Sequence, residues 1–75
     1  MKIYGYAISS PEKLEELKEI SFMASPSELV TIADFFVKKA AAFERDKNLD
    51  HVHFSDFIGN RAADNEIVLC NPTIS

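Results

Sequence analysis

Apolar and polar residues between positions 25 and 46 follow the period of an α-helix. Leu29 is followed by further apolar residues at steps of three and four, and polar residues fall mainly on the other side. This spacing predicts one long helix whose apolar stripe packs on the core. The stripe consists of Leu29, Ile32, Ala33, Phe36, Val37, Ala40 and Phe43, and the polar side of Thr31, Asp34, Lys38, Arg45 and Asp46.

The start of this helix is marked by three residues with defined capping roles. Ser25 is placed to cap the first turn with its hydroxyl, and Pro26 suits the first helical position because it lacks an N–H group. Glu28 follows the cap by three residues and can accept a hydrogen bond from the Ser25 amide, which completes a capping box. We therefore predict a helix from Pro26 to about Asp46.

The segments on either side of the helix carry patterns typical of β-strands. Residues 2–8 are rich in Ile and Tyr and predict a strand, and residues 18–24 alternate between apolar and polar and predict a half-buried one. The charged residues 12–16 predict a helical turn. Residues 51–58 fit a strand only in part, a turn follows at Gly59-Asn60, and residues 65–71 predict a last strand that ends at Pro72.

Together these elements predict a single α+β domain over residues 1–75. One long helix would pack on one face of a small, mostly antiparallel sheet of three or four strands, in the order β-β-α-(β)-β. The strands before and after the helix would share this sheet, and any parallel crossover between them would be right-handed. A chain of this length forms a small core and is marginally stable alone.

The first strand predicts which of its faces meets the helix. Ile3, Gly5 and Ala7 form a face of small side chains that the helix could approach closely. Tyr4 and Tyr6 would then lie on the opposite face, which is low in charge and could include Met23, Val68 and Cys70. Such a face suits a protein partner or a second copy of the chain. Alternatively, residues 54–58 fold over it and make it a second layer of core.

Charge and cysteine content narrow the classes of partner and location. Eight basic and twelve acidic residues give a formal net charge of −4, which disfavours binding to nucleic acid and favours a basic protein partner. The single cysteine, Cys70, cannot form an internal disulfide, which indicates a reducing compartment or an incidental thiol. No signal peptide or membrane-spanning run is expected, and the mixed polar face of the helix does not suit a membrane surface. We expect a cytoplasmic protein.

The residues that could carry chemistry are few. His51 and His53 would point the same way on a strand and could share a metal, but further ligands are not placed by the sequence. They could equally form ordinary hydrogen bonds or contact a partner. Ser55, His53 and Asp56 would splay apart in an extended chain, and no nucleophile elbow or phosphate-binding loop is present. We expect no metal, no cofactor and no catalytic residue.

The order of several short motifs resembles the Immunity protein 32 family of bacterial polymorphic toxin systems. The resemblance covers most of the chain. It is carried by residues 19–26 with Glu28-Leu29, by Ile32-Ala33-Asp34-Phe35-Phe36, by His51-x-His53-Phe54-x-Asp56, and by the strand Ile67-Val68-Leu69 leading to Asn71-Pro72.

This resemblance implies a small immunity-type protein that binds a cognate toxin and neutralises it by covering its surface. The candidate partner-binding residues are Tyr4 and Tyr6 as aromatic anchors, and His51, His53 and Asp56 as polar contacts. A non-catalytic homodimeric module is the alternative, because the small core and the apolar second face also suit self-association.

Overall fold

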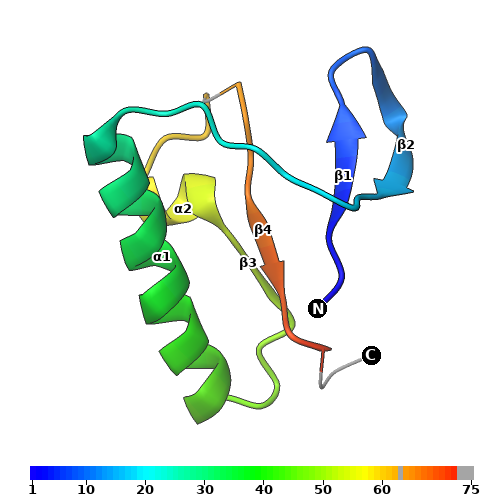
Figure 1. Cartoon of the computed structure of the whole chain (residues 1–75). Coiled ribbons are helices and arrows are strands. Elements are labelled where there is room, and N and C mark those ends of the chain that lie inside the picture. Colours follow the sequence, from blue (N-terminus) through cyan, green and yellow to red (C-terminus); the bar gives the residue numbers. More distant parts are fainter. Residues whose placement is uncertain (63, 73–75) are drawn as a thin grey trace.

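The computed structural model describes residues 1–62 and 64–72 and has α+β architecture (Figure 1). A hairpin comes first, a long helix follows, and a second antiparallel pair of strands encloses a short helix. The elements are β1 (Tyr4–Ala7), β2 (Ser10–Glu16), α1 (Pro26–Arg45), β3 (His51–His53), α2 (Phe54–Ile58) and β4 (Val68–Cys70). Among the described residues, no helix combines the length and the apolarity needed to cross a membrane.

The predicted start of the long helix is confirmed. The Ser25 hydroxyl accepts a hydrogen bond from the Glu28 amide at 3.2 Å, and the Ser25 amide donates to the Glu28 carboxylate at 2.8 Å. These bonds form the capping box expected from the sequence, with Pro26 in the first turn. The hydrogen bond from the Ser25 backbone, and then that with its side chain, lower the pKa of Glu28 from its ordinary value of 4.5.

The face of α1 that meets the rest of the molecule differs from the predicted one. Phe35 is the one fully buried large side chain among the described residues, and it was not part of the predicted stripe. Its ring lies 5.2 Å from that of Phe54 and 5.3 Å from that of Phe57, between centroids. Phe35 faces inward because these two rings of α2 pack against it. Leu29, Phe36 and several other residues of the predicted stripe are exposed.

The first strand is confirmed, but the helical turn predicted for residues 12–16 is wrong. These residues belong to β2, which pairs antiparallel with β1, with Tyr6 opposite Leu14. Lys13 and Glu15 lie 3.3 Å apart, since residues two apart share one face of a strand. The Leu17 amide extends the ladder by donating to the Ile3 carbonyl at 2.7 Å. Pairing with β1 therefore overrides the charged composition of this segment.

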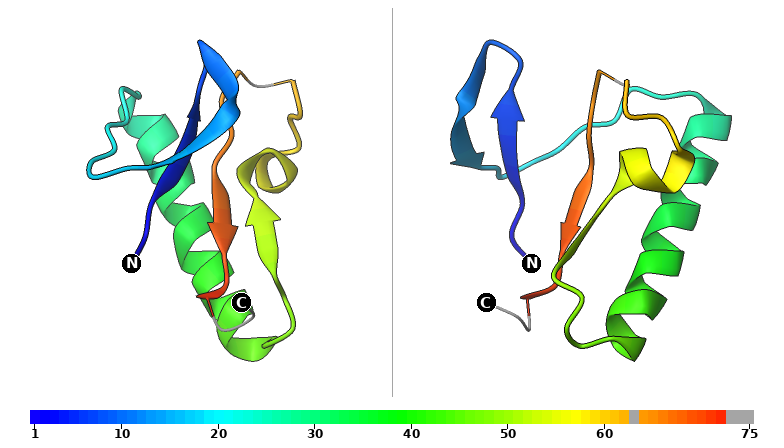
Figure 2. Two further views of the ribbon diagram at one scale, coloured as in Figure 1. Left: turned by 90° about the vertical axis from the view of Figure 1, so that its right-hand side faces the viewer. Right: turned by 180° about the vertical axis from the view of Figure 1, so that it is seen from behind.

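Gly5 makes room for Leu17 and not for the helix, contrary to the prediction. A Cβ atom at Gly5 would lie 2.9 Å from the Leu17 Cδ1 atom. The hairpin stands on the opposite side of the β3–β4 pair from α1, as Figure 1 and the right-hand view of Figure 2 show. The close approach at Gly5 is therefore made within the hairpin and its continuation.

The four strands form two separate two-stranded antiparallel sheets, β1–β2 and β3–β4, and not one continuous sheet. The predicted strand at residues 18–24 is absent: this segment is an irregular connector without a strand partner, and Ile20, Phe22 and Met23 on it are exposed. Its alternating pattern produces no strand because no neighbouring strand accepts its backbone hydrogen bonds. The expected pairing across the helix is therefore not formed.

Residues 51–58, left open by the sequence, are a strand followed at once by a short helix. In the β3–β4 pair, Val52 lies opposite Leu69, and the Phe54 amide donates to the Ile67 carbonyl at 2.9 Å. The helix α2 then ends at Gly59, whose φ of 69° is in the left-handed region that glycine adopts readily. Since Phe54 and Phe57 pack on Phe35, α2 covers α1 and not the two tyrosines.

Candidate functional site

The candidate site is an open depression where α1, β3 and α2 meet. It has a volume of about 390 Å³ and collects residues from all three elements. Three of the five predicted partner-binding residues, His51, His53 and Asp56, line it together. The lining consists of Lys39, His51, Val52, His53, Asp56 and Phe57.

The two histidines are brought together by their spacing on β3. Residues two apart on a strand point to the same side, and the rings of His51 and His53 lie 5.2 Å apart in an edge-to-face arrangement. His51 Nδ1 lies 3.0 Å from the Asp50 carboxylate, and His53 Nδ1 lies 3.4 Å from that of Glu66. Each imidazole therefore has its own acidic neighbour.

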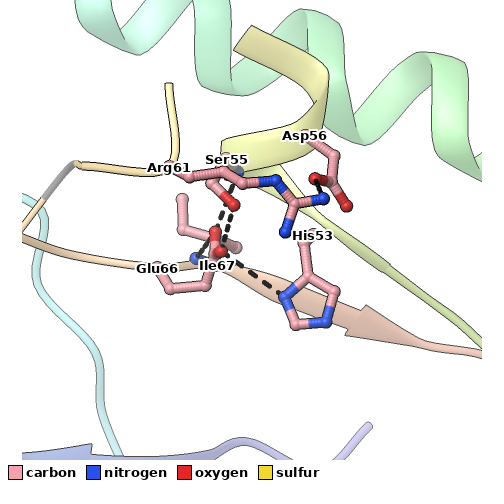
Figure 3. Close-up of polar contacts among 6 residues, drawn as sticks. All are labelled: His53, Ser55, Asp56, Arg61, Glu66 and Ile67. Atoms are coloured by element: carbon pink, nitrogen blue, oxygen red, sulfur yellow. Dashed lines mark hydrogen bonds and ion pairs between the residues drawn. The ribbon is translucent and has the colours of Figure 1, made fainter. Parts of the chain in front are cut away.

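Glu66 orders the end of β3 and the start of α2 (Figure 3). Its carboxylate accepts hydrogen bonds from the Ser55 amide at 2.9 Å, from the Ser55 hydroxyl at 2.5 Å and from the Ile67 amide at 3.0 Å. Burial acts to raise the pKa of Glu66, but the bonds from Ser55, Ile67 and His53 outweigh it and hold that pKa below its ordinary value of 4.5. Glu66 is therefore ionised when it holds Ser55, Ile67 and His53 in place.

Asp56 carries an ion pair at the rim of the depression. It lies in the first turn of α2, and its carboxylate pairs with the guanidinium of Arg61 (Figure 3). About half of the Asp56 side chain and most of the Arg61 side chain remain exposed. An incoming cationic group could therefore compete with Arg61 for Asp56 with little desolvation of the carboxylate.

Lys39 and Phe57 form the wall of the depression next to α1. The Lys39 ammonium lies 5.7 Å from the centroid of the Phe57 ring, at the distance of a cation–π contact. Lys39 is half-buried because it lies one helical turn after Phe35, on the same inward face of α1. The wall thus offers an aromatic ring and a fixed cation.

Tyr4 and Tyr6 lie on the hairpin, apart from the depression. Their side chains are 49% and 61% exposed, so both remain available at the surface as expected. Tyr6 lies opposite Leu14 on β2, and these apolar side chains are left without cover from the helix. The structure therefore divides the five predicted residues between two surfaces.

Sequence reasoning missed Glu66 and its hydrogen bonds with Ser55. Eleven positions separate them, and an exposed polar loop lies between, so neither periodicity nor motif spacing links them. Lys39 was detectable in principle, since it follows Phe35 by four residues. Its place in the site depends on which of Phe35 and Phe36 turns inward.

The site offers hydrogen-bonding groups, charged groups and an aromatic surface. Glu66 lies between Ser55 and His53, whereas a catalytic triad has the histidine between the serine and the carboxylate. A lowered pKa also makes Glu66 a weak base. Over residues 1–62 and 64–72, no group of three or more potential ligands is placed to hold a metal.

Two more contacts hold the strand pair that carries the site. Asn71 is buried, and its backbone N–H group donates to the Asp50 carbonyl at 2.8 Å. Its side-chain nitrogen donates to the Leu49 carbonyl at 3.1 Å, which fixes the loop that leads into His51.

Comparison with family models, curated proteins and solved structures finds no match for this chain.

Proposed function

We propose that this chain is an immunity-type protein that binds a cognate bacterial toxin and neutralises it by covering its surface. The observation that carries the proposal is the gathering of His51, His53 and Asp56 at one open depression. These three residues belong to the block by which the sequence resembles the Immunity protein 32 family. Their shared position at the surface supports a role for that block in binding.

The charge of the site favours a basic partner. Asp56 lines the depression, and Asp50 and Glu66 lie beside its two histidines, each with a third or more of the side chain exposed. These three carboxylates outnumber the two cations Lys39 and Arg61, and the chain has a net charge of −4. Such a surface accelerates the approach of a positively charged protein and aligns it before contact. In this proposal, a Lys or Arg of the toxin replaces Arg61 at the Asp56 carboxylate.

The hairpin supplies a second contact surface in the same proposal. Tyr4 and Tyr6 present large rings at low cost in side-chain entropy, as aromatic anchors do at many interfaces. Inhibition follows from occlusion alone, with one immunity protein for each toxin. The lone cysteine fits a cytoplasmic protein, which would meet a toxin after its entry into the cell.

Mixing this chain with the product of a toxin gene adjacent to its own gene tests the proposal. We expect a one-to-one complex by calorimetry, with an affinity that weakens at least about tenfold in Asp56→Ala and in His51→Ala. Glu44→Ala is the matched control, because this 85% exposed carboxylate lies outside the depression. The absence of a complex at micromolar concentrations would overturn the function, and equal binding by all variants would overturn the site.

A further inference from the structure

We infer that a second copy of this chain docks on the outer face of α1, so that two α1 helices pair antiparallel about a two-fold axis. The face is defined here as the outer stripe, a continuous set of exposed apolar residues along the helix. The outer stripe consists of Leu29, Val30, Ala33, Phe36, Val37 and Ala40. Val30 and Val37 are 69% and 70% exposed, and Leu29 and Phe36 about 40%.

The outer stripe is exposed because the inward face of α1 is already occupied. Phe35 packs on α2, and Thr31, Lys39 and Ala42 share its side of the helix. In Figure 1 and in the right-hand view of Figure 2, α1 forms one border of the molecule, with α2 and the β3–β4 pair on its inner side. An exposed apolar stripe on a helix is normally the side that packs against another element, so a cover over the outer stripe is favourable.

The chain exposes more surface than a compact monomer of its mass, which leaves room for an interface. The accessible surface is 6309 Å², and the chain has a mass of 8.4 kDa. A compact folded monomer of that mass exposes about 4,600 Å². The difference of roughly 1,700 Å² exceeds the about 800 Å² that each partner of a stable interface buries. A dimer along α1 therefore removes only part of the surplus.

The outer stripe is complementary to itself. Leu29, Ala33, Phe36 and Ala40 are spaced four, three and four residues apart, which is the spacing of a helix–helix seam. Large and small side chains alternate along this seam, so that Phe36 of one copy lies opposite Ala33 of the other and Leu29 lies opposite Ala40. The two-fold axis that produces this match passes midway between Ala33 and Phe36, close to the middle of Pro26–Arg45, so the helices pair over most of their length.

Charge favours a second copy over a basic toxin at this face. The outer stripe contains no ionisable residue, and its flanking pair Asp34 and Lys38 already interact with each other at 3.0 Å. The stripe itself therefore offers no carboxylate to a basic toxin, whereas the antiparallel arrangement places the positive end of each helix dipole beside the negative end of the other. The depression lies on the inward side of α1 and stays free, so the dimer does not depend on the proposed toxin.

Sedimentation of the purified full chain between about 1 and 100 μM tests this inference, since a micromolar dimer dissociates within that range. We expect a mass of twice 8.4 kDa at the upper end. Val37→Glu should raise the dissociation constant at least about 100-fold, because it buries two carboxylates near the axis. Met23→Glu, at a fully exposed apolar residue outside the outer stripe, should leave the dimer intact.

A monomer at all concentrations would overturn the inference, as would a dimer that survives Val37→Glu or is lost equally in Met23→Glu. Circular dichroism establishes that each variant keeps its helix. If Val37→Glu unfolds, thiol crosslinking tests the same contact. In a Cys70→Ser background, a short crosslinker should join two copies of the Val37→Cys variant much faster than two copies of the Met23→Cys variant. Equal or reversed rates would place the contact elsewhere.

Discussion

Glu66 accepts hydrogen bonds from both the amide and the hydroxyl of Ser55, eleven residues earlier in the chain. This contact joins the first turn of α2 to the residue that leads into β4. Because His53 also faces the same carboxylate, one side chain holds the turn between β3 and α2 in place. The shape of the depression therefore depends on Glu66, although Glu66 does not line it.

Replacing Glu66 by alanine should destabilise the fold measurably. The substitution leaves the Ser55 and Ile67 amides without their acceptor, and we expect a loss of about 1–2 kcal/mol in the free energy of unfolding. Glu44→Ala removes a surface carboxylate that pairs only with Lys47 and should change stability by less than about 0.5 kcal/mol. Urea unfolding measures both, and equal effects would contradict the role given to Glu66.

Stability should fall on acidification because of Glu66 and Glu28. The folded-state pKa of each lies below the ordinary value of 4.5. The unfolded chain therefore takes up protons first, and the stabilisation present above that value is lost as the pH falls through the folded pKa. Unfolding followed between about pH 6 and pH 3 should show a shallower decline in Glu66→Gln and in Glu28→Gln. Unchanged slopes in both variants would contradict this account.

Removal of the helix cap should weaken the whole fold. Ser25→Ala loses the acceptor for the Glu28 amide, and we expect a cost of about 1 kcal/mol. Ser21→Ala is the matched control, because Ser21 is an exposed serine of the connector before the helix. Thermal melting of the two variants provides the comparison. A Ser21→Ala protein as unstable as Ser25→Ala would contradict the capping role.

Phe35 should be the most sensitive position of the core. Phe35→Ala removes the ring that packs against both Phe54 and Phe57, at an expected cost of about 3–4 kcal/mol. A chain of this size has roughly 4–11 kcal/mol in total, so the variant should be largely unfolded at moderate temperature. Phe22→Ala, at a 43% exposed ring of the connector, should cost much less. Loss of the near-ultraviolet signal in Phe22→Ala alone would contradict this core assignment.

Local signals in the sequence predicted the helix well. Ser25, Pro26 and Glu28 act within one turn of one another, so the cap can be read from four consecutive residues, and the helix runs from Pro26 to Arg45. The strand nature of residues 10–16 depends on pairing with β1, and their charged composition hides it. The spacing of apolar residues also does not show whether Phe35 or Phe36 faces the core. That choice depends on where α2 places the rings of Phe54 and Phe57.

The site was predictable only where its residues are neighbours in sequence. His51 and His53 share a strand and Asp56 follows within one turn of α2, so a single block brings all three together. Glu66 reaches the same place through a contact across the polar loop, for which the sequence carries no periodic signal. The hairpin with Tyr4 and Tyr6 depends on a tertiary arrangement that places it beyond the β3–β4 pair.

Hydrogen exchange of the chain with and without its toxin tests the central claim most directly, because it reports which backbone amides a partner covers. The account predicts that toxin binding slows exchange across residues 50–57, which carry His51, His53 and Asp56, with weaker protection on β1. Protection confined to the outer stripe of α1, with residues 50–57 exchanging as in the free protein, would contradict it.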